Sequence, residues 1–162
     1  MPPAFTVRPA QRGDVSSILR MIRELAEFEH LTHLCTATAA QLKKELFGPE
    51  ATAESLIAES DGTSVGYAIY FHNLSTFLGR KGLYLEDLYV RPSHRHRGCG
   101  RALLIAVARI AAERGCARFE WMALDWNTPA IDFYEKLGAA QMKEWRLLRV
   151  TGEALRKLAE LR

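Results

Sequence analysis

A cluster of arginines and glycines lies between an expected strand and an expected helix. Residues 83–90 form an apolar, β-rich run that ends before Pro92, and residues 102–112 carry an apolar stripe at helical spacing. The cluster between them contains Arg95, Arg97, Gly98, Gly100 and Arg101. A glycine-containing turn before a helix presents backbone N–H groups that bind phosphate, and arginine side chains add positive charge there. The pattern therefore predicts a site for a phosphate or pyrophosphate group.

Two other phosphate-binding motifs do not fit this stretch. A P-loop needs the pattern Gly-x-x-x-x-Gly-Lys-Ser/Thr, which is absent, and a dinucleotide fingerprint needs three glycines where this chain has two. The pattern that is present is Arg95-x-x-Gly98-x-Gly100. Taken alone, the same residues could also form a surface turn that begins a helix, with His94 and His96 as solvated turn residues rather than phosphate contacts.

Adjacent carboxylates and a later tyrosine could move protons. Glu86 and Asp87 lie within the expected strand 83–90, where neighbouring side chains point to opposite faces of a regular sheet. Tyr134 lies in an expected helix that begins at Asn127 or Thr128 and ends at Gly138. A phenol with a pKa of about 10 is protonated at neutral pH and can donate to a strong base. The alternative for Tyr134 is packing in the core beside its neighbour in the helix.

Two of these segments resemble motifs of the GNAT N-acetyltransferase family. The Arg95–Gly100 pattern is similar to the acyl-CoA pyrophosphate loop, and residues 127–139 are similar to the motif Asn-x-x-(Ala/Ser)-x-x-(Phe/Leu)-Tyr-x-x-x-Gly-(Ala/Phe). The resemblance implies acetyl-CoA as cosubstrate, with the pantetheine arm bound along the preceding strand, and Tyr134 as general acid for the coenzyme thiolate. The residues implied to bind acetyl-CoA are Leu88, Tyr89, Val90, Arg95, His96, Arg97, Gly98, Cys99, Gly100, Arg101, Asn127 and Tyr134. Because Cys99 belongs to this loop, we expect direct transfer in a ternary complex rather than an acyl-cysteine intermediate.

Further segments resemble the spermidine/spermine and thialysine N-acetyltransferase subgroup, and the resemblance covers nearly the whole chain. They are residues 7–10, 23–29, 84–87, 123–127 and 145–147. The subgroup implies Glu86 as a base acting through water, a strand bulge near it, a small primary amine as acceptor and a homodimer. The residues that we expect to bind the acceptor are Glu29, Glu86, Asp87 and Trp145, although Trp145 could equally be a core residue.

Two departures from the subgroup bear on the substrate. The segment 73–82 contains no acidic residue, and Lys143 stands where the subgroup has an acid. A multiply charged polyamine needs several carboxylates near its ammonium groups. The remaining carboxylates can neutralise one ammonium group; they are Glu29, Glu86 and Asp87. The sequence therefore favours a diamine or lysine analogue over spermine as the acceptor.

Composition limits the expected partners. The 162 residues, 48% of them hydrophobic, suit a single domain over residues 1–162. A net charge of +3 without a long basic run predicts that the protein has no nucleic-acid partner. The apolar runs are too short to span a membrane, so we expect no membrane insertion. The cysteines Cys35, Cys99 and Cys116 lack metal-ligand spacing, which predicts no metal and favours reduced thiols in the cytoplasm. The segment from Met1 to Phe5 has no signal-peptide features.

The order of the expected elements predicts an α/β (α+β) fold with a mixed sheet and helices on both faces. The family resemblance implies the same architecture, a GNAT-like mixed, mostly antiparallel central sheet. The expected strands are 5–8, 55–59, 65–72, 83–90, 117–124 and 145–150, with a loop at 73–82. The expected helices begin at Asp14, at Thr38, at residue 99, at residue 127 and at residue 152. Asp61-Gly62 predicts a hairpin turn, and Thr38-x-x-Gln41 predicts a capping box.

Three other functions compete with small-amine acetylation. A protein lysine or N-terminal acetyltransferase would need an open groove for a peptide. A CoA-binding sensor without turnover would keep the fold but lose the proton-transfer groups, and both Tyr134 and Glu86 are present. A nucleic-acid-binding domain built on the basic loop lacks interleaved aromatic and basic residues.

Overall fold

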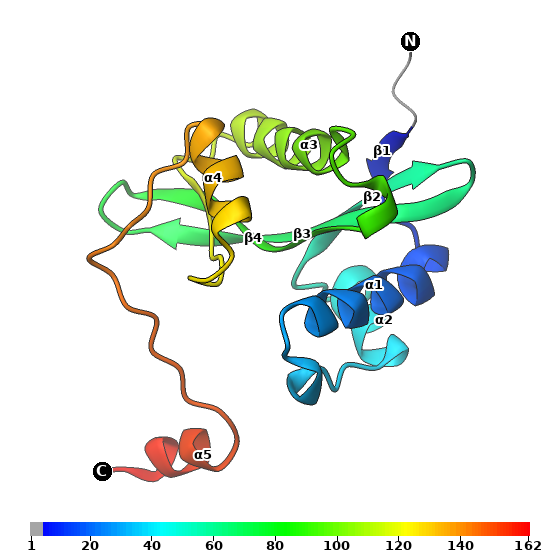
Figure 1. Cartoon of the computed structure of the whole chain (residues 1–162). Coiled ribbons are helices and arrows are strands. Elements are labelled where there is room, and N and C mark those ends of the chain that lie inside the picture. Colours follow the sequence, from blue (N-terminus) through cyan, green and yellow to red (C-terminus); the bar gives the residue numbers. More distant parts are fainter. Residues whose placement is uncertain (1–4) are drawn as a thin grey trace. The chain divides into compact units, whose positions relative to one another are not determined.

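A computed structural model of the chain describes residues 5–162 (Figure 1). The segment 1–4, on which most of the argument about a signal peptide rests, lies outside the described residues. The chain forms two compact units, Met1–Met122 and Ala123–Arg162, and each is described by itself. Within residues 5–162, no helix combines the length and apolar character that crossing a membrane requires.

The first unit is built on a five-stranded sheet with the strand order β1-β2-β3-β4-β5. The strands are β1 (Thr6–Pro9), β2 (Glu54–Ser60), β3 (Thr63–Ser75), β4 (Arg80–Val90) and β5 (Phe119–Trp121). The first four pair antiparallel, and β5 pairs parallel to β4. The predicted mixed, mostly antiparallel sheet is therefore confirmed.

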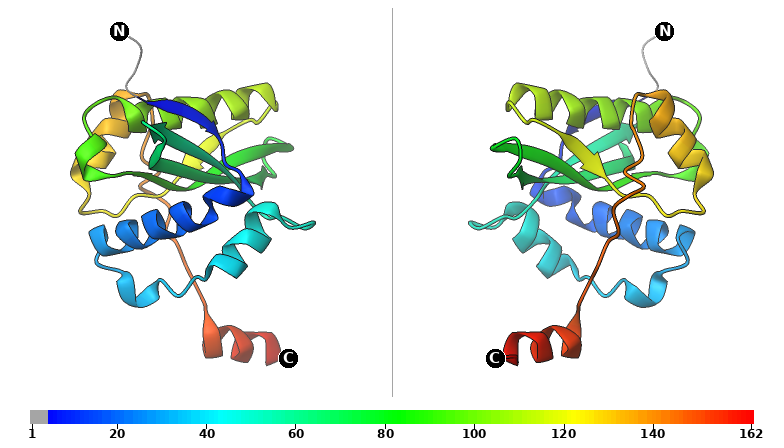
Figure 2. Two further views of the ribbon diagram at one scale, coloured as in Figure 1. Left: turned by 90° about the vertical axis from the view of Figure 1, so that its right-hand side faces the viewer. Right: turned by 90° about the vertical axis from the view of Figure 1, so that its left-hand side faces the viewer.

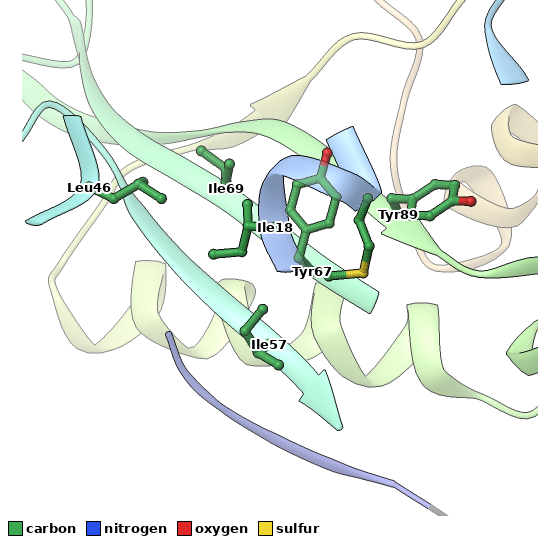
Figure 3. Packing of buried hydrophobic residues seen from close by; sticks show 7 residues of the cluster. Ile18, Leu46, Ile57, Tyr67, Ile69 and Tyr89 are labelled. Atoms are coloured by element: carbon green, nitrogen blue, oxygen red, sulfur yellow. The ribbon is translucent and has the colours of Figure 1, made fainter. Parts of the chain in front are cut away.

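Helices cover both faces of this sheet (Figure 2). Helices α1 (Val15–Phe28) and α2 (Ala39–Phe47) lie on one face, and α3 (Cys99–Glu113) lies on the other. Short 3-10 turns occupy Arg12–Asp14, Thr32–Leu34 and Pro92–His94. The core between α1 and the sheet contains Ile18, Met21, Leu46, Ile57, Tyr67, Ile69 and Tyr89 (Figure 3). Because both faces carry apolar side chains against helices, the sheet is fixed where the site residues lie.

The local signals in the sequence are largely confirmed. Asp61 and Gly62 both have positive φ, of 49° and 71°, as a two-residue turn between β2 and β3 requires. The Thr38 hydroxyl accepts from the Gln41 N–H, and the Gln41 side chain accepts from the Thr38 N–H, which completes the predicted capping box at the start of α2.

The expected loop at 73–82 is wrong for most of its length. Asn73 pairs with Gly82 and Ser75 with Arg80, so most of this segment extends β3 and β4 into a longer hairpin. Cross-strand pairing makes these residues strand, and a hydrogen bond of 2.8 Å from Asn73 Nδ2 to Glu120 Oε1 adds a side-chain contact with β5. The expected strand 117–124 is also shorter, because only Phe119–Trp121 pair with β4.

The second unit contains α4 (Thr128–Lys136) and α5 (Gly152–Glu160). The expected strand at 145–150 is wrong, since these residues, all of them described, form no strand. A strand requires a hydrogen-bonding partner along its edge, and an apolar pattern alone cannot supply one. Large apolar side chains in and after this segment are exposed, namely Trp145, Leu147, Leu148, Val150, Leu155, Leu158 and Leu161.

Candidate functional site

A bulge in β4 separates the two adjacent carboxylates. Asp87 pairs with Ile69 and Leu85 pairs with Tyr70, so Glu86 is the extra residue and the register shifts there. Glu86 is exposed, whereas Asp87 is half-buried against the sheet. The bulge expected from the family resemblance is therefore present at the expected residue, and it gives the two carboxylates different surroundings.

Asp87 belongs to a small acidic cluster in the first unit. The hydroxyl of Tyr67 donates to Oδ2 of Asp87 at 2.9 Å. Burial raises the pKa of Asp87 to about 6, and the negative charges of Glu86 and Glu29 act in the same direction, while the Tyr67 hydrogen bond opposes them. Burial also raises the pKa of Glu29, which caps the C-terminus of α1. The three acidic residues predicted to bind an acceptor thus lie close enough to influence one another.

Glu29 also borders a cavity of about 400 Å³ beside α1. The rest of its lining is largely apolar and includes Ile22, Leu25, Leu31 and Leu34. A cavity with apolar walls and one carboxylate suits the hydrocarbon part of a molecule that carries a single ammonium group.

The end of β4 has an open edge beside this cluster. Strand β5 pairs with β4 only from Leu83 to Leu85, and in the described part of the chain no strand pairs with the rest of β4 on that side. The N–H of Arg91 donates to Val65 on β3, so by strand alternation the backbone groups of Tyr89 face β3 while those of Leu88 and Val90 face the open edge. An extended amide-containing ligand could add there as another strand.

The loop after β4 connects this strand to the N-terminus of α3. His96 and Gly98 both adopt positive φ, of 60° and 83°, and Gly98 is the N-cap residue. The first N–H groups of a helix have no intrahelical partner, and the first turn of α3 carries no acidic residue. A methyl group built at Gly100 would meet only Val90, at an ordinary 3.7 Å, so the described fold does not require glycine there. These features fit an anionic group such as a pyrophosphate.

The arginines of this loop differ in their surroundings. Arg95 Nε donates to the Val90 carbonyl at 2.8 Å, and its guanidinium lies over the rings of Phe28 and Tyr89, at 4.9 and 5.5 Å from their centroids. Arg97 and Arg101 are exposed, as is His96. Arg95 therefore ties the loop to β4 and α1, whereas Arg97 and Arg101 present their charge at the surface.

Cys99 lies between the two glycines, but its side chain is buried with an exposure of 1%. Burial raises the pKa of its thiol to about 11, so the thiol is protonated at neutral pH. Its side chain therefore lacks the thiolate that an acyl-cysteine intermediate needs, and only its backbone N–H is suited to a ligand in the loop.

The second unit places Tyr134 in the last turn of α4. Gly138 has a φ of 98°, and the N–H groups of Ala139 and Gly138 donate to the carbonyls of Tyr134 and Glu135, which is a Schellman motif. The Tyr134 ring is half-buried with its centroid 5.3 Å from that of Phe133. The predicted helix end is confirmed, and it fixes the backbone that carries the tyrosine.

Two further predicted residues lie in this unit. Asn127 is the N-cap residue of α4, yet among the described residues its side chain makes no capping hydrogen bond to the helix. Trp145 is 71% exposed, so the alternative that it is a core residue is wrong for the chain described here. The Trp145 side chain is therefore available to a ligand or to another protein chain, and the Asn127 amide is not used for capping α4.

Sequence reasoning did not single out Tyr67, which contacts Asp87 from β3. Its position within an apolar strand favours an ordinary core residue. The available signal was the β3–β4 hairpin, because pairing these strands across 20 residues brings the two side chains onto one face.

Comparison with known proteins shows which sequences and folds this chain is similar to. The family model described as "Acetyltransferase (GNAT) family" matches residues 19–139. The chain is 40% identical to the thialysine N-epsilon-acetyltransferase of Sus scrofa, over 94% of this chain and 96% of that protein. It is 33% identical to the L-ornithine N5-acetyltransferase of Arabidopsis thaliana, over 96% of this chain and 88% of that protein. Among solved structures, an integron cassette protein from V. cholerae is similar with a TM-score of 0.82 and 23% identity, covering 98% of this chain and 99% of that one, which supports the fold.

Proposed function

The chain belongs to the GNAT acetyltransferase family, and from this premise we propose that it transfers an acetyl group from acetyl-CoA to the primary amine of a small substrate. The acceptor class is a diamine, a polyamine or a lysine analogue such as thialysine, the substrate named for a 40% identical relative. The observation that carries the proposal is the acidic cluster around Asp87 beside an open β4 edge that leads into the N-terminus of α3. The two units together would make one acetyltransferase domain over residues 1–162.

The coenzyme would be held mainly by backbone. Leu88 and Val90 would bind the pantetheine arm along the open edge, with Tyr89 between them, and the loop from His96 to Gly100 would bind the pyrophosphate. Arg97 and Arg101 would supply positive charge, while Arg95 anchors the loop. Asn127 is proposed to contact the pantetheine region because of its place in the family motif. Bound acetyl-CoA supplies the activated acyl group as a thioester.

The acceptor amine must lose a proton before it attacks. An alkylamine has a pKa of about 10.4 and arrives as an ammonium ion, which Glu29, Asp87 and Glu86 would neutralise. Glu86, exposed at the bulge, would take the proton through a water molecule, and Tyr134 would protonate the departing coenzyme thiolate. The buried, protonated Cys99 supports direct transfer without an acyl-enzyme. Trp145 is proposed to contact the acceptor.

The test of this function is the release of free CoA from acetyl-CoA with a panel of acceptors. The panel contains putrescine, spermidine, spermine, thialysine, lysine, simple monoamines and a lysine peptide. Because the cavity beside Glu29 is largely apolar and the segment 73–82 has no acidic residue, we expect a higher rate of CoA release with thialysine or a short diamine than with spermine. A highest rate with the peptide would favour protein acetylation instead, and no rate above hydrolysis with any acceptor would favour a CoA-binding sensor.

We also propose a homodimer in the cytoplasm, without metal, membrane or nucleic-acid partners. Support for the dimer comes from the large apolar side chains that are exposed between Trp145 and Leu161, because exposed apolar side chains gathered in one segment are typical of an interface. Support for a cytoplasmic location comes from the free thiols of Cys35, Cys99 and Cys116, because cysteines stay reduced in the cytoplasm.

Replacing Leu148 with glutamate is expected to weaken the dimer, because this side chain is 90% exposed within the apolar segment. A buried charge opposes association, so the variant should shift toward monomer by size-exclusion chromatography with light scattering. Phe77→Glu is the matched control, since Phe77 is 98% exposed at the β3–β4 turn, outside that segment. A wild-type protein that is purely monomeric, or equal effects of both variants, would contradict the proposal.

A further inference from the structure

Tyr67 is a core tyrosine whose hydroxyl group donates a hydrogen bond to the Asp87 carboxylate. Its side chain is 0% exposed and lies in the cluster with Ile18 and Met21, with its ring centroid 6.3 Å from that of Tyr89 (Figure 3). A buried hydroxyl requires a hydrogen-bond partner. The partner here is Oδ2 of Asp87, at 2.9 Å, so the rigid core determines where that carboxylate lies.

The register of the sheet explains this contact. Asp87 pairs with Ile69, and Tyr67 is two residues along β3, which is the diagonal position on the same face. Because Glu86 is bulged out, Asp87 pairs with Ile69. In a regular ladder continuing from Leu85 and Tyr70, Asp87 would instead pair with Ala68 and its side chain would lie on the other face. The contact therefore depends on the same irregularity that exposes Glu86.

The other groups that face Asp87 disfavour its ionised form. Glu86 acts from β4 and Glu29 from the end of α1, and both carry negative charge, while burial removes water from the carboxylate. Tyr67, from β3, is the hydrogen-bond donor that opposes these effects. An ammonium group is attracted to Asp87 only while Asp87 is ionised, so the balance among these groups bears on acceptor binding.

We propose that Tyr67 is a positioning residue that holds Asp87 in place and keeps it ionised for binding the ammonium group of the acceptor. The inference rests on the proposed function, because it assigns Asp87 to acceptor binding. It extends that function by making the affinity for the amine, rather than the rate of chemistry, depend on a tyrosine that does not contact the substrate.

Replacing Tyr67 with phenylalanine removes the donor and keeps the buried ring. The pKa of Asp87, about 6 in the wild type, is expected to rise by about 1 unit, because a hydrogen bond to a charged group is lost. The KM for the amine should then increase roughly fivefold at pH 6, where the ionised fraction of Asp87 would fall from about one half to about one tenth, and remain close to wild type at pH 8. The kcat at saturating amine should change little at either pH. A rise in KM that is equal at both pH values would overturn the proposal.

Two further variants separate this effect from general destabilisation. Tyr70→Phe is the matched control, since Tyr70 is also a buried tyrosine of β3 but lies near Glu54 and Arg114 rather than Asp87. It should leave the pH dependence of KM unchanged. In an Asp87→Asn background, adding Tyr67→Phe should produce no further pH-dependent change, and a full additional shift there would contradict the proposed coupling.

A measurement without turnover distinguishes failure of this inference from failure of the proposed function. In the wild-type protein, ¹³C NMR titration should show the Asp87 carboxyl carbon and the Tyr67 ring carbon that bears the hydroxyl changing with one common midpoint. Independent midpoints, or no response of Tyr67, would overturn the pairing even if amines are acetylated. Conversely, a shared midpoint with no acetylation of any amine would keep the pairing and reject the proposed function.

Discussion

Replacing Tyr134 with phenylalanine is expected to lower kcat by roughly 10²–10⁴-fold, the range in which general-acid catalysis contributes. The change removes one hydroxyl group and leaves an aromatic ring of the same shape beside Phe133. The Schellman motif that ends α4 uses backbone groups of Tyr134, Glu135 and Gly138, so the helix should be retained. Steady-state kinetics with the best amine of the panel would measure the effect.

Coenzyme affinity separates a catalytic role of Tyr134 from a binding role. The dissociation constant for acetyl-CoA, measured by calorimetry, should change little in Tyr134→Phe, because the proposed hydrogen bond matters in the transition state. Tyr70→Phe provides the control for loss of a tyrosine hydroxyl elsewhere in the fold and should keep wild-type kcat. An unchanged kcat in Tyr134→Phe would remove Tyr134 from the mechanism.

Replacing Glu86 with glutamine is expected to lower kcat about 10²-fold and to change the pH–rate profile. Glu86 is exposed at the β4 bulge, so water has access to its carboxylate, as the proposed proton relay requires. Glutamine has a similar shape but cannot accept the proton. The profile of kcat against pH, measured with saturating amine, isolates this step from acceptor binding.

The neighbouring variant Asp87→Asn makes the assignment of the base specific. Asp87 is half-buried and hydrogen-bonded to Tyr67, so we expect its loss to raise the KM for the amine more than it lowers kcat. If Glu86→Gln keeps the wild-type pH–rate profile while Asp87→Asn loses kcat, the proton acceptor is Asp87 rather than Glu86. Either result leaves the assignment of Tyr134 unaffected.

Features fixed by a few consecutive residues could be predicted from the sequence. The Asp61-Gly62 turn, the Thr38–Gln41 capping box and the end of α4 at Gly138 all depend on backbone conformations that particular residue types favour. The glycine-containing loop before α3 was predicted for the same reason. Family membership followed from such local patterns, and the comparisons confirm it.

Features that depend on pairing between distant segments were missed or misplaced. The segment 73–82 was predicted to be a loop but extends a hairpin, and 145–150 was predicted to be a strand but forms none. Whether such a segment becomes strand is decided by a partner edge, which the segment's own residues do not contain.

The sequence by itself determined the chemical groups of the candidate site, namely the glycine- and arginine-containing loop before α3, the adjacent carboxylates of β4 and the tyrosine of α4. The tertiary structure alone decided how these groups are tuned. The β4 bulge exposes Glu86, and the β3–β4 hairpin brings Tyr67 to Asp87. The guanidinium of Arg95 packs over the ring of Phe28, so this arginine anchors the loop to α1. The physical reason is that hydrogen bonding, desolvation and charge interaction act over a few ångströms in space, and chain folding brings residues far apart in sequence to that distance.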